Sequence, residues 1–263
     1  FSLNFHMSLE GTDLDKLALS TEKLLAGTDS KITTVGYYCN PIQYAEHRKT
    51  LENVICTAGE FGATHVSTFA GAWEGKPVES AYEEFGKVFR ELADLAEEKG
   101  VKLGIENCLM DGTWEHATCN IGFNPKAWEV MFEEVKNDNF GLEWEPTHQM
   151  VQLIDPVTEL RKWCKKIVHI HGKDATIDWD AVRHSGISGA VPFVWHRMPG
   201  FGDTNWRDII SILRSNGYED DICIEGYHDP VYSGELEMTG QLHALNYLKW
   251  CRGGDFTPTP WAK

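Results

Sequence analysis

The sequence predicts an α/β protein in which strands and helices alternate and close into a (β/α)8 TIM barrel that lacks, or is truncated in, its first βα unit. Short apolar segments with the alternation typical of strands recur along the chain, and each is followed by a segment with helical spacing of apolar residues. No G-x-G-x-x-G turn follows the first strand, as it would in an open dinucleotide-binding sheet. We therefore favour the closed barrel over the open sheet.

Seven segments are expected to be strands: residues 2–5, 32–38, 65–70, 102–107, 140–145, 167–171 and 222–226. A closed barrel of this kind has eight strands. Because the chain starts abruptly at a strand, without an initiator methionine, we expect the missing unit to lie before Phe1. No linker or low-complexity stretch divides the chain, so residues 1–263 are expected to form one domain with a short tail after about residue 252.

Capping residues predict where the helices begin. Ser80 and Glu83 have the spacing of a capping box, before an amphipathic helix that Gly100 ends. Proline loses no helical hydrogen bond at the first position, so a cap residue followed by proline also predicts a start. Three such pairs occur: Asn40-Pro41, Asn124-Pro125 and Asp155-Pro156. Two further helices are expected, one from Thr204 to Gly217 and one over about residues 236–251.

The composition disfavours several classes of protein. The formal net charge is −16, and no run of Lys or Arg forms a basic stripe, so nucleic acid is not an expected partner. No apolar run approaches the roughly 18 residues of a membrane span. The seven cysteines include no C-x-x-C pair, which is typical of free thiols in a reducing compartment. We therefore expect a cytoplasmic protein that does not bind a membrane.

Ionisable side chains stand at the carboxyl ends of the last four of these strands. Glu106 ends KLGIEN, Glu145 ends FGLEWE, His171 ends IVHIH and Glu225 ends ICIEG. In a parallel barrel these ends share one face, where three carboxylates would repel one another unless a cation neutralised them. Three oxygen donors and one imidazole suit Mn²⁺, Mg²⁺ or Co²⁺ better than a tetrahedral zinc site. Any one of these residues alone is also typical of a solvated strand end, but four together indicate a metal site.

Five segments carry a resemblance to a known family: G-I-E-N (104–107), E-P-T-H (145–148), H-I-H-G-K-D (169–174), P-G-F-G-D-T-N-W (199–206) and I-E-G (224–226). In order and spacing they resemble the xylose-isomerase-like TIM-barrel superfamily. This superfamily includes sugar isomerases, ketose 3-epimerases, inositol-catabolic dehydratases and endonuclease-IV-type nucleases. The resemblance extends from about residue 30 to residue 250.

The resemblance implies a site for one divalent metal ion. Mn²⁺ is the preferred ion, and Mg²⁺, Co²⁺ and Zn²⁺ are the alternatives. Its ligands would be Glu106, Glu145, His171 and Glu225. Glu145 stands where the family usually has aspartate, and its extra methylene would shift the metal or change the carboxylate denticity. His169 and His171 point to the same side of their strand; His171 matches the family's ligand, whereas His169 is expected to be a core histidine.

Proton transfer is expected from Glu106 and Glu225, with His148 as a reserve base because a metal-bound carboxylate is weakly basic. The expected substrate contacts come from Arg197, Lys173, Trp73, Trp114 and His196. Lys173 could instead form a surface pair with Asp174, and each tryptophan could instead pack a loop onto the barrel rim. A glutamate and an arginine that grip the substrate in ketose 3-epimerases are replaced here by Gly112 and Ile177.

Four functions remain open from the sequence. The first is a metal-dependent isomerase or epimerase that acts on a ketose or keto-sugar through an enediolate. The second is a lyase or dehydratase of a keto-sugar, a keto-glycoside or an inositol derivative, which the missing epimerase residues favour. Phosphodiester cleavage of DNA would need more metal ligands and a basic face. A barrel with a vestigial or structural metal could also serve as a partner subunit. For the enzyme hypotheses we expect a small carbohydrate substrate, and a homo-oligomer is one option because barrels of this family commonly pair.

Overall fold

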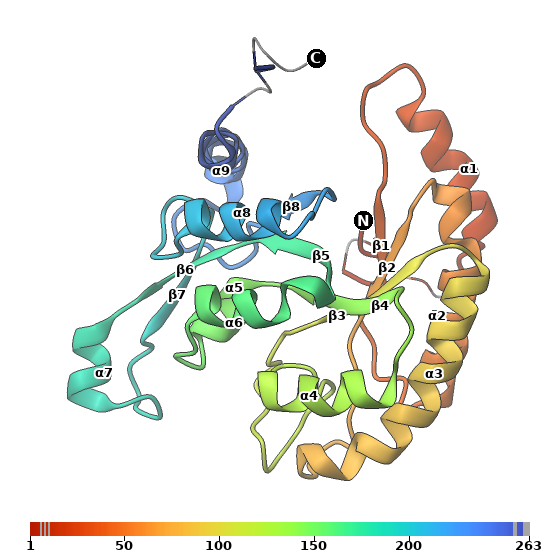
Figure 1. The fold of residues 1–263 in the computed structure, drawn as a ribbon, viewed down its shortest axis with the longest axis horizontal. Coiled ribbons are helices and arrows are strands. Elements are labelled where there is room, and N and C mark those ends of the chain that lie inside the picture. The colour runs from red at the N-terminus through yellow and green to blue at the C-terminus, as the bar shows by residue number, and fades with distance from the viewer. Residues whose placement is uncertain (6, 8, 10, 255–256, 260–263) are drawn as a thin grey trace. The chain divides into compact units, whose positions relative to one another are not determined.

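The structure, a computed structural model, describes residues 1–5, 7, 9, 11–254 and 257–259. The chain divides into two compact units, and Figure 1 shows its helices and strands. The first comprises Phe1–His148 and Lys166–Ile170, and the second comprises Gln149–Lys165 and His171–Lys263. Residues 255–256 and 260–263 of the expected C-terminal tail lie outside the described part of the chain.

A parallel sheet forms the centre of the first unit. Its strands, in spatial order, are β1 (Thr34–Gly36), β2 (His65–Thr68), β3 (Lys102–Glu106), β4 (Phe140–Trp144) and the first part of β5 (Ile167–Gly172). Every residue of β1, β2 and β4 is buried, as is typical of parallel strands covered on both faces. Burial here includes polar side chains, such as those of His65, Ser67 and Thr68 in β2.

Helices cover the sheet of the first unit (Figure 1). They are α1 (Leu14–Leu25), α2 (Ala45–Thr57), α3 (Tyr82–Glu98) and α4 (Pro125–Glu134), with 3₁₀ turns η1 (Ala58–Phe61) and η2 (Val78–Ala81) and the start of α5 (Pro146–Met150). The α3 helix packs on β3 and contacts both α2 and α4. Phe85 and Phe89 of α3 stack on each other and pack against Phe140 of β4. None of the helices among the described residues has the length and apolar character to cross a membrane.

The second unit combines helices with two short stretches of sheet. Its helices are α6 (Pro156–Trp163), α7 (Trp179–Ser185), α8 (Trp206–Ser215) and α9 (Glu237–Arg252), with 3₁₀ turns η3 (Cys164–Lys166) and η4 (Gly234–Leu236). The end of β5 meets β8 (Ile222–Ile224), where the Glu225 amide donates to the Gly172 carbonyl at 3.1 Å. β6 (Asp174–Ile177) and β7 (Val194–Arg197) form an antiparallel hairpin that carries α7 (Figure 1).

The hairpin corrects the expectation that a helix follows every strand. After β5 the chain enters β6, α7 and β7 before it reaches α8. A second correction concerns residues 2–5, which form no strand and make only an isolated bridge between Ser2 and Gly36. Backbone hydrogen bonds from Leu3 to Gly36 and from Gly36 to Phe1 show that this segment runs parallel to β1, over too few residues to count as a strand. The other six expected strands are confirmed, most of them with tighter bounds.

Two of the expected cap–proline starts are confirmed. The Asn124 side chain accepts from the Lys126 amide at 3.0 Å, and the Asp155 side chain accepts from the Val157 amide at 3.0 Å. Each proline therefore occupies the first turn of its helix, where its missing N–H costs nothing. The helix expected from Thr204 begins at Trp206, because Asn205 is its cap.

Two other expected starts are wrong. The Ser80 hydroxyl donates to the Pro77 carbonyl within η2, so it caps no helix, and α3 begins at Tyr82. The segment after Asn40 forms turns, and α2 begins at Ala45. The Asn40 side chain still accepts from the Gln43 amide at 3.2 Å, as a cap would, but it also makes two hydrogen bonds to Ala72, which is far along the chain. A capping pattern shows only that a side chain can bind nearby amides, and tertiary contacts compete for the same atoms.

The core of the first unit gives a direct stability prediction. Leu92 of α3 is 0% exposed and Leu24 of α1 is 79% exposed. We expect Leu92→Ala to lower the free energy of unfolding by about 2–5 kcal/mol, because it removes buried methyl groups and leaves a cavity. Leu24→Ala is the matched control and should change stability by less than about 0.5 kcal/mol. Urea unfolding followed by fluorescence measures both, and equal effects would contradict the assigned core.

Candidate functional site

The predicted site residues are divided between the two units. The first unit contains Trp73, Glu106, Trp114, Glu145 and His148, and the second contains Lys173, His171, His196, Arg197 and Glu225.

Glu106 and Glu145 stand at the ends of neighbouring strands of the first unit. Glu106 is the last residue of β3 and Glu145 follows the last residue of β4, and their exposed fractions are 7% and 0%. The register pairs Glu106 with Glu143, so Glu145, two residues after Glu143, lies just past the end of β4 on the same side. Burial of an ionised carboxylate is costly unless a cation or strong donors compensate it. Two buried carboxylates at adjacent strand ends therefore suit a divalent cation.

His148 contacts the second of these carboxylates. Its Nε2 atom lies 3.2 Å from Oε1 of Glu145, and the ring is buried. The contact follows from local geometry, because Glu145 precedes α5 and His148 lies one helical turn later. His148 is thus held beside a predicted metal ligand, as expected for a residue that acts near the metal.

Two buried asparagines that the sequence analysis did not single out bind the backbone at these strand ends. The Asn107 side chain accepts from the Glu145 amide at 2.7 Å and donates to the Glu145 carbonyl at 2.9 Å. The Asn120 side chain donates to the Glu106 carbonyl at 2.9 Å. Asn107 follows Glu106 directly in G-I-E-N, which was the one signal in the sequence; Asn120 lies in a polar loop without a distinguishing pattern.

A further buried polar layer lies on β4 and β5. Glu143 and His169 are both buried, with Nε2 of His169 3.8 Å from Oε1 of Glu143. The Tyr38 hydroxyl donates to Glu143 at 2.9 Å, and Nδ1 of His169 lies 3.4 Å from the Thr34 hydroxyl. This confirms the expectation that His169 is a core histidine that binds its neighbours.

The two tryptophans of the first unit occupy loops. Trp114 donates its indole N–H to Glu79, and its carbonyl accepts from the Val78 amide at 2.9 Å. These bonds pack the loop after β3 onto η2, which corresponds to the alternative of a loop-packing tryptophan. Trp73 is half-buried in the turn after β2. Their role as substrate contacts stays a prediction.

In the second unit, His171, Lys173 and Glu225 come together. The Lys173 ammonium donates to Oε1 of Glu225 at 2.7 Å, and Nδ1 of His171 lies 3.1 Å from Oε2. Burial alone would raise the pKa of Glu225, but the His171 hydrogen bond and the Lys173 charge outweigh it and hold that pKa well below its usual range. Lys173 is only 3% exposed, so it is not the surface partner of Asp174 that the sequence left open. This group contains an imidazole and an ionised carboxylate that suit a metal.

Arg197 and His196 lie at the end of β7, where Arg197 pairs with Asp174, the residue that follows Lys173. His196 pairs with Ala175, and its ring centre is 5.6 Å from that of His228. The Arg197 guanidinium donates through Nε to Asp229 at 3.3 Å. Arg197 is therefore oriented by a carboxylate from the loop after β8, a contact that the sequence did not reveal.

Asp229 organises this part of the second unit. It is buried and accepts from the backbone amides of Met198, Val231 and Tyr232 as well as from Arg197. Burial acts to raise its pKa, but the amide hydrogen bonds lower it further than burial raises it, so the net pKa is lowered. The ionised carboxylate thus ties the end of β7 to the loop that follows β8.

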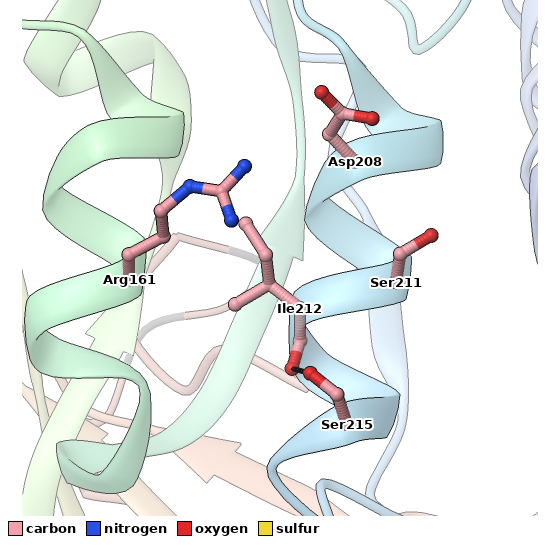
Figure 2. Close-up of a pocket in the computed structure, with 5 residues that line it drawn as sticks. All are labelled: Arg161, Asp208, Ser211, Ile212 and Ser215. Atoms are coloured by element: carbon pink, nitrogen blue, oxygen red, sulfur yellow. Dashed lines mark hydrogen bonds between the residues drawn. The ribbon is translucent and has the colours of Figure 1, made fainter.

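A small depression lies between α6 and α8 of the second unit (Figure 2). It is lined by Arg161, Asp208, Ser211, Ile212 and Ser215. None of these is a predicted site residue, and their side chains lie on the helix flanks. The depression therefore contributes nothing to the candidate site.

The fold and the match to a family profile define the class of protein. The profile of the xylose isomerase-like TIM barrel family matches residues 3–249, so the chain belongs to this family. This confirms the predicted resemblance and the predicted fold class.

Among the characterised relatives are proteins named inosose dehydratase. The chain is 26% identical over 182 residues to an inosose dehydratase of Clostridium tetani, a match that covers 67% of this chain and 57% of the relative. It is 22% identical over 227 residues to an inosose dehydratase of Clostridium perfringens, covering 83% of this chain and 73% of the relative. The chain thus spans less than two thirds of the first of these proteins.

Solved structures show the same fold. A xylose isomerase domain protein of Planctomyces limnophilus superposes with a TM-score of 0.70 at 17% identity, over 90% of this chain and 82% of that one. The 3-keto-D-glucoside 4-epimerase of E. coli superposes with a TM-score of 0.66 at 14% identity, over 90% of this chain and 86% of that one. The IOLI protein, solved with a bound zinc atom, superposes with a TM-score of 0.63 at 21% identity, over 92% of this chain and 81% of that one.

Asp229 gives a pH-dependent stability prediction. Because its pKa is lowered in the folded chain, its ionised form stabilises the fold above the ordinary aspartate pKa, and this contribution is lost as pH falls towards the lowered value. We expect Asp229→Asn to cost about 1–3 kcal/mol at pH 7, because its amide would face backbone N–H donors. The difference from the parent chain should shrink in acid. Urea unfolding at several pH values measures this, with the exposed Asp180→Asn as control; a pH-independent difference would contradict it.

Proposed function

We propose that the protein is a divalent-metal-dependent lyase that removes water from an inosose or a related keto-cyclitol. The observation that carries this proposal is the similarity to proteins named inosose dehydratase, along 67% and 83% of the chain. Its family supplies a barrel on which strand-end residues carry the chemistry. The charge of −16 and the absence of a basic stripe in the sequence agree with a small uncharged substrate rather than a nucleic acid.

We assign one divalent cation to Glu106, Glu145, His171 and Glu225, with Mn²⁺ as the preferred metal. Support comes from the buried carboxylates that end β3 and β4, and from the imidazole–carboxylate pair that His171 forms with Glu225. Three carboxylates and one imidazole form a donor set that hard or borderline divalent ions accept. When bound, such an ion polarises a ketone and acidifies the neighbouring C–H bond.

Dehydration then requires a base and an acid from the protein. The base removes the proton from the carbon beside the ketone, and the acid protonates the hydroxyl group that leaves the next carbon. The C–H and C–O bonds break, a C=C bond forms, and one water molecule departs. We propose Glu106 and Glu225 for these proton transfers, with His148 as the alternative base, because His148 is held at 3.2 Å from Glu145 without being assigned as a ligand.

Two cationic side chains are proposed to bind substrate oxygens. Lys173 is a buried ammonium fixed by Glu225, and Arg197 is oriented by Asp229. Both are donors held by carboxylates, so little side-chain entropy would be lost when they bind a hydroxyl or ketone oxygen. His196, Trp73 and Trp114 remain proposed substrate contacts from the sequence.

The loop after β3 supports a dehydratase over a ketose 3-epimerase. A Cβ atom at Gly112 would lie 3.2 Å from the Leu109 carbonyl oxygen and 3.3 Å from the Thr118 amide nitrogen. The backbone of this loop is therefore closed around a glycine and would have to shift to accept the epimerase glutamate. The second epimerase residue is replaced by Ile177, which ends β6 in the hairpin.

An isomerase or epimerase is the second candidate, because it would begin with the same removal of a proton beside a ketone. The structural similarity to the 3-keto-D-glucoside 4-epimerase agrees with it at the level of the fold. The two reactions differ in the fate of the enolate, which is reprotonated on carbon in one case and expels a hydroxyl group in the other.

One incubation distinguishes them. The purified chain is mixed with MnCl₂ and an inosose in deuterium oxide, and the product is analysed by mass spectrometry and ultraviolet absorption. A dehydratase gives a product lighter by one water that absorbs as a conjugated ketone. An epimerase gives a product of unchanged composition with one carbon-bound deuterium. If inososes and keto-sugars both return unaltered and undeuterated, the proposed function is wrong.

Glu225 provides the sharpest mutational prediction. Glu225→Gln keeps the shape of the side chain but removes the charge that His171 and Lys173 bind. We expect kcat to fall by about 10²–10⁴-fold and the affinity for Mn²⁺ to drop, with the circular dichroism spectrum unchanged. The exposed Glu235→Gln is the matched control and should behave as the parent. Full activity in Glu225→Gln would remove this residue from the site.

Metal removal provides an independent prediction. Dialysis against EDTA should abolish turnover, and added Mn²⁺ or Co²⁺ should restore it, because the proposed donor set is rich in oxygen. Elemental analysis should find about one metal ion per chain in the parent and none in Glu145→Ala. Turnover that survives complete chelation would contradict a metal-dependent reaction.

A further inference from the structure

We propose that buried asparagine side chains continue the hydrogen bonding of the parallel sheet beyond its strand ends, and that Asn107 and Asn120 thereby position the backbone of Glu106 and Glu145. These asparagines are positioning residues and need not touch substrate or metal. The inference rests on the proposed function in one respect, namely that Glu106 and Glu145 are metal ligands.

The first bridge joins the ends of β3 and β4. Backbone pairing between these strands ends with Glu106 opposite Glu143, so Glu145 extends past the last registered pair. There the side chain of Asn107 acts as a substitute for a neighbouring peptide. It accepts from the Glu145 N–H at 2.7 Å and donates to the Glu145 C=O at 2.9 Å. Both backbone groups of a fully buried residue are therefore satisfied by one amide.

The second bridge joins the loop after β2 to the end of β3. The Oδ1 atom of Asn120 accepts from the amides of Ala70 and Gly122 at 2.9 and 3.0 Å. Its Nδ2 atom donates to the carbonyls of Glu106 and Cys108 at 2.9 and 2.8 Å. These four bonds use the two donors and two lone pairs of the amide completely. Asn120 is 0% exposed, so no water competes for them.

A third bridge has the same form but reaches neither carboxylate. Asn40, which follows β1, accepts from the Ala72 amide and donates to the Ala72 carbonyl, both at 2.9 Å. Ala72 lies in the turn after β2. Asn40 therefore links the ends of β1 and β2, and it supplies an internal control for the other two asparagines.

Only an amide side chain fits these positions. Aspartate could accept from the backbone amides, but it would place a negative charge against a carbonyl oxygen and beside the buried glutamates. Serine carries a donor and an acceptor on one atom and is too short to span both backbone groups. The asparagines thus fix the backbone from which each glutamate projects before any metal binds, which lowers the cost of assembling the ligands.

The test compares Asn107→Ala, Asn107→Ser and Asn120→Ala with Asn40→Ala in the full chain. Binding of Mn²⁺ is measured by titration calorimetry and the spectrum of the bound ion by electron paramagnetic resonance, alongside thermal unfolding. We expect the Asn107 and Asn120 variants to bind Mn²⁺ about 10–100-fold more weakly, with an altered spectrum. Asn40→Ala should bind within about twofold of the parent although it loses the two buried hydrogen bonds to Ala72 and two further bonds to Gln43 and Glu74.

Parent-like Mn²⁺ binding in a folded Asn107→Ser chain would overturn the proposal. An equal loss of Mn²⁺ affinity in Asn40→Ala would also overturn it, because the effect would then come from a general loss of stability. A second readout needs no metal. Amide hydrogen exchange at Glu145 in the metal-free chain should be at least about tenfold faster in Asn107→Ser than in the parent and unchanged in Asn40→Ala. If the parent binds no Mn²⁺, the proposed function is wrong, but hydrogen exchange still tests the positioning role. Exchange at Glu145 that is the same in Asn107→Ser as in the parent would overturn the positioning role.

Discussion

Burial of carboxylates at the ends of parallel strands is the constraint on which the rest of this structure depends. Glu143 and Glu145 are fully buried, and Glu106 nearly so. An ionised carboxylate in such a place costs several kcal/mol unless donors or a cation compensate it. In the first unit the Tyr38 hydroxyl donates to Glu143, His148 lies beside Glu145, and asparagine side chains bind the Glu145 amide and the Glu106 carbonyl. The sheet alone would not keep these side chains inside.

The second unit uses its acidic residues in a different way. Glu225 is held by Lys173 and His171, whereas Asp174 and Asp229 bind backbone amides. Asp174 accepts from the amides of Ala175, Gly200 and Thr204, and a Cβ atom at Gly202 would lie 2.3 Å from one of its oxygens. The P-G-F-G-D-T segment is therefore glycine-rich because the chain closes around a buried carboxylate. Residues that look catalytic in a motif can thus have a purely architectural role.

Membership of the family defines the barrel but not the reaction, because one fold supports many chemistries through its loops. Removal of a proton beside a ketone is common to the dehydratase and epimerase alternatives. What separates them is the set of groups that meet the enolate afterwards. In this chain the loop after β3 is closed around Gly112, and a helix-bearing hairpin stands between β5 and α8. The closed loop at Gly112 disfavours the ketose 3-epimerase pattern, whereas the dehydratase proposal itself rests on the similarity to inosose dehydratases.

The sequence by itself determined the features that depend on near neighbours. Apolar alternation predicted β2 to β5, and Asn124 and Asp155 predicted two helix starts, since a cap binds amides only two or three residues away. The strand-end positions of Glu106, Glu145, His171 and Glu225 followed from the same periodicity. Tertiary structure alone decided the β6–β7 hairpin and the roles of Asn40, Asn120 and Asp229. Asn40 accepts from the nearby Gln43 amide, as a cap would, but it also binds Ala72, 32 residues away. Asp229 binds Met198, 31 residues away. A hydrogen bond over such a separation exists only once the chain between its partners has folded.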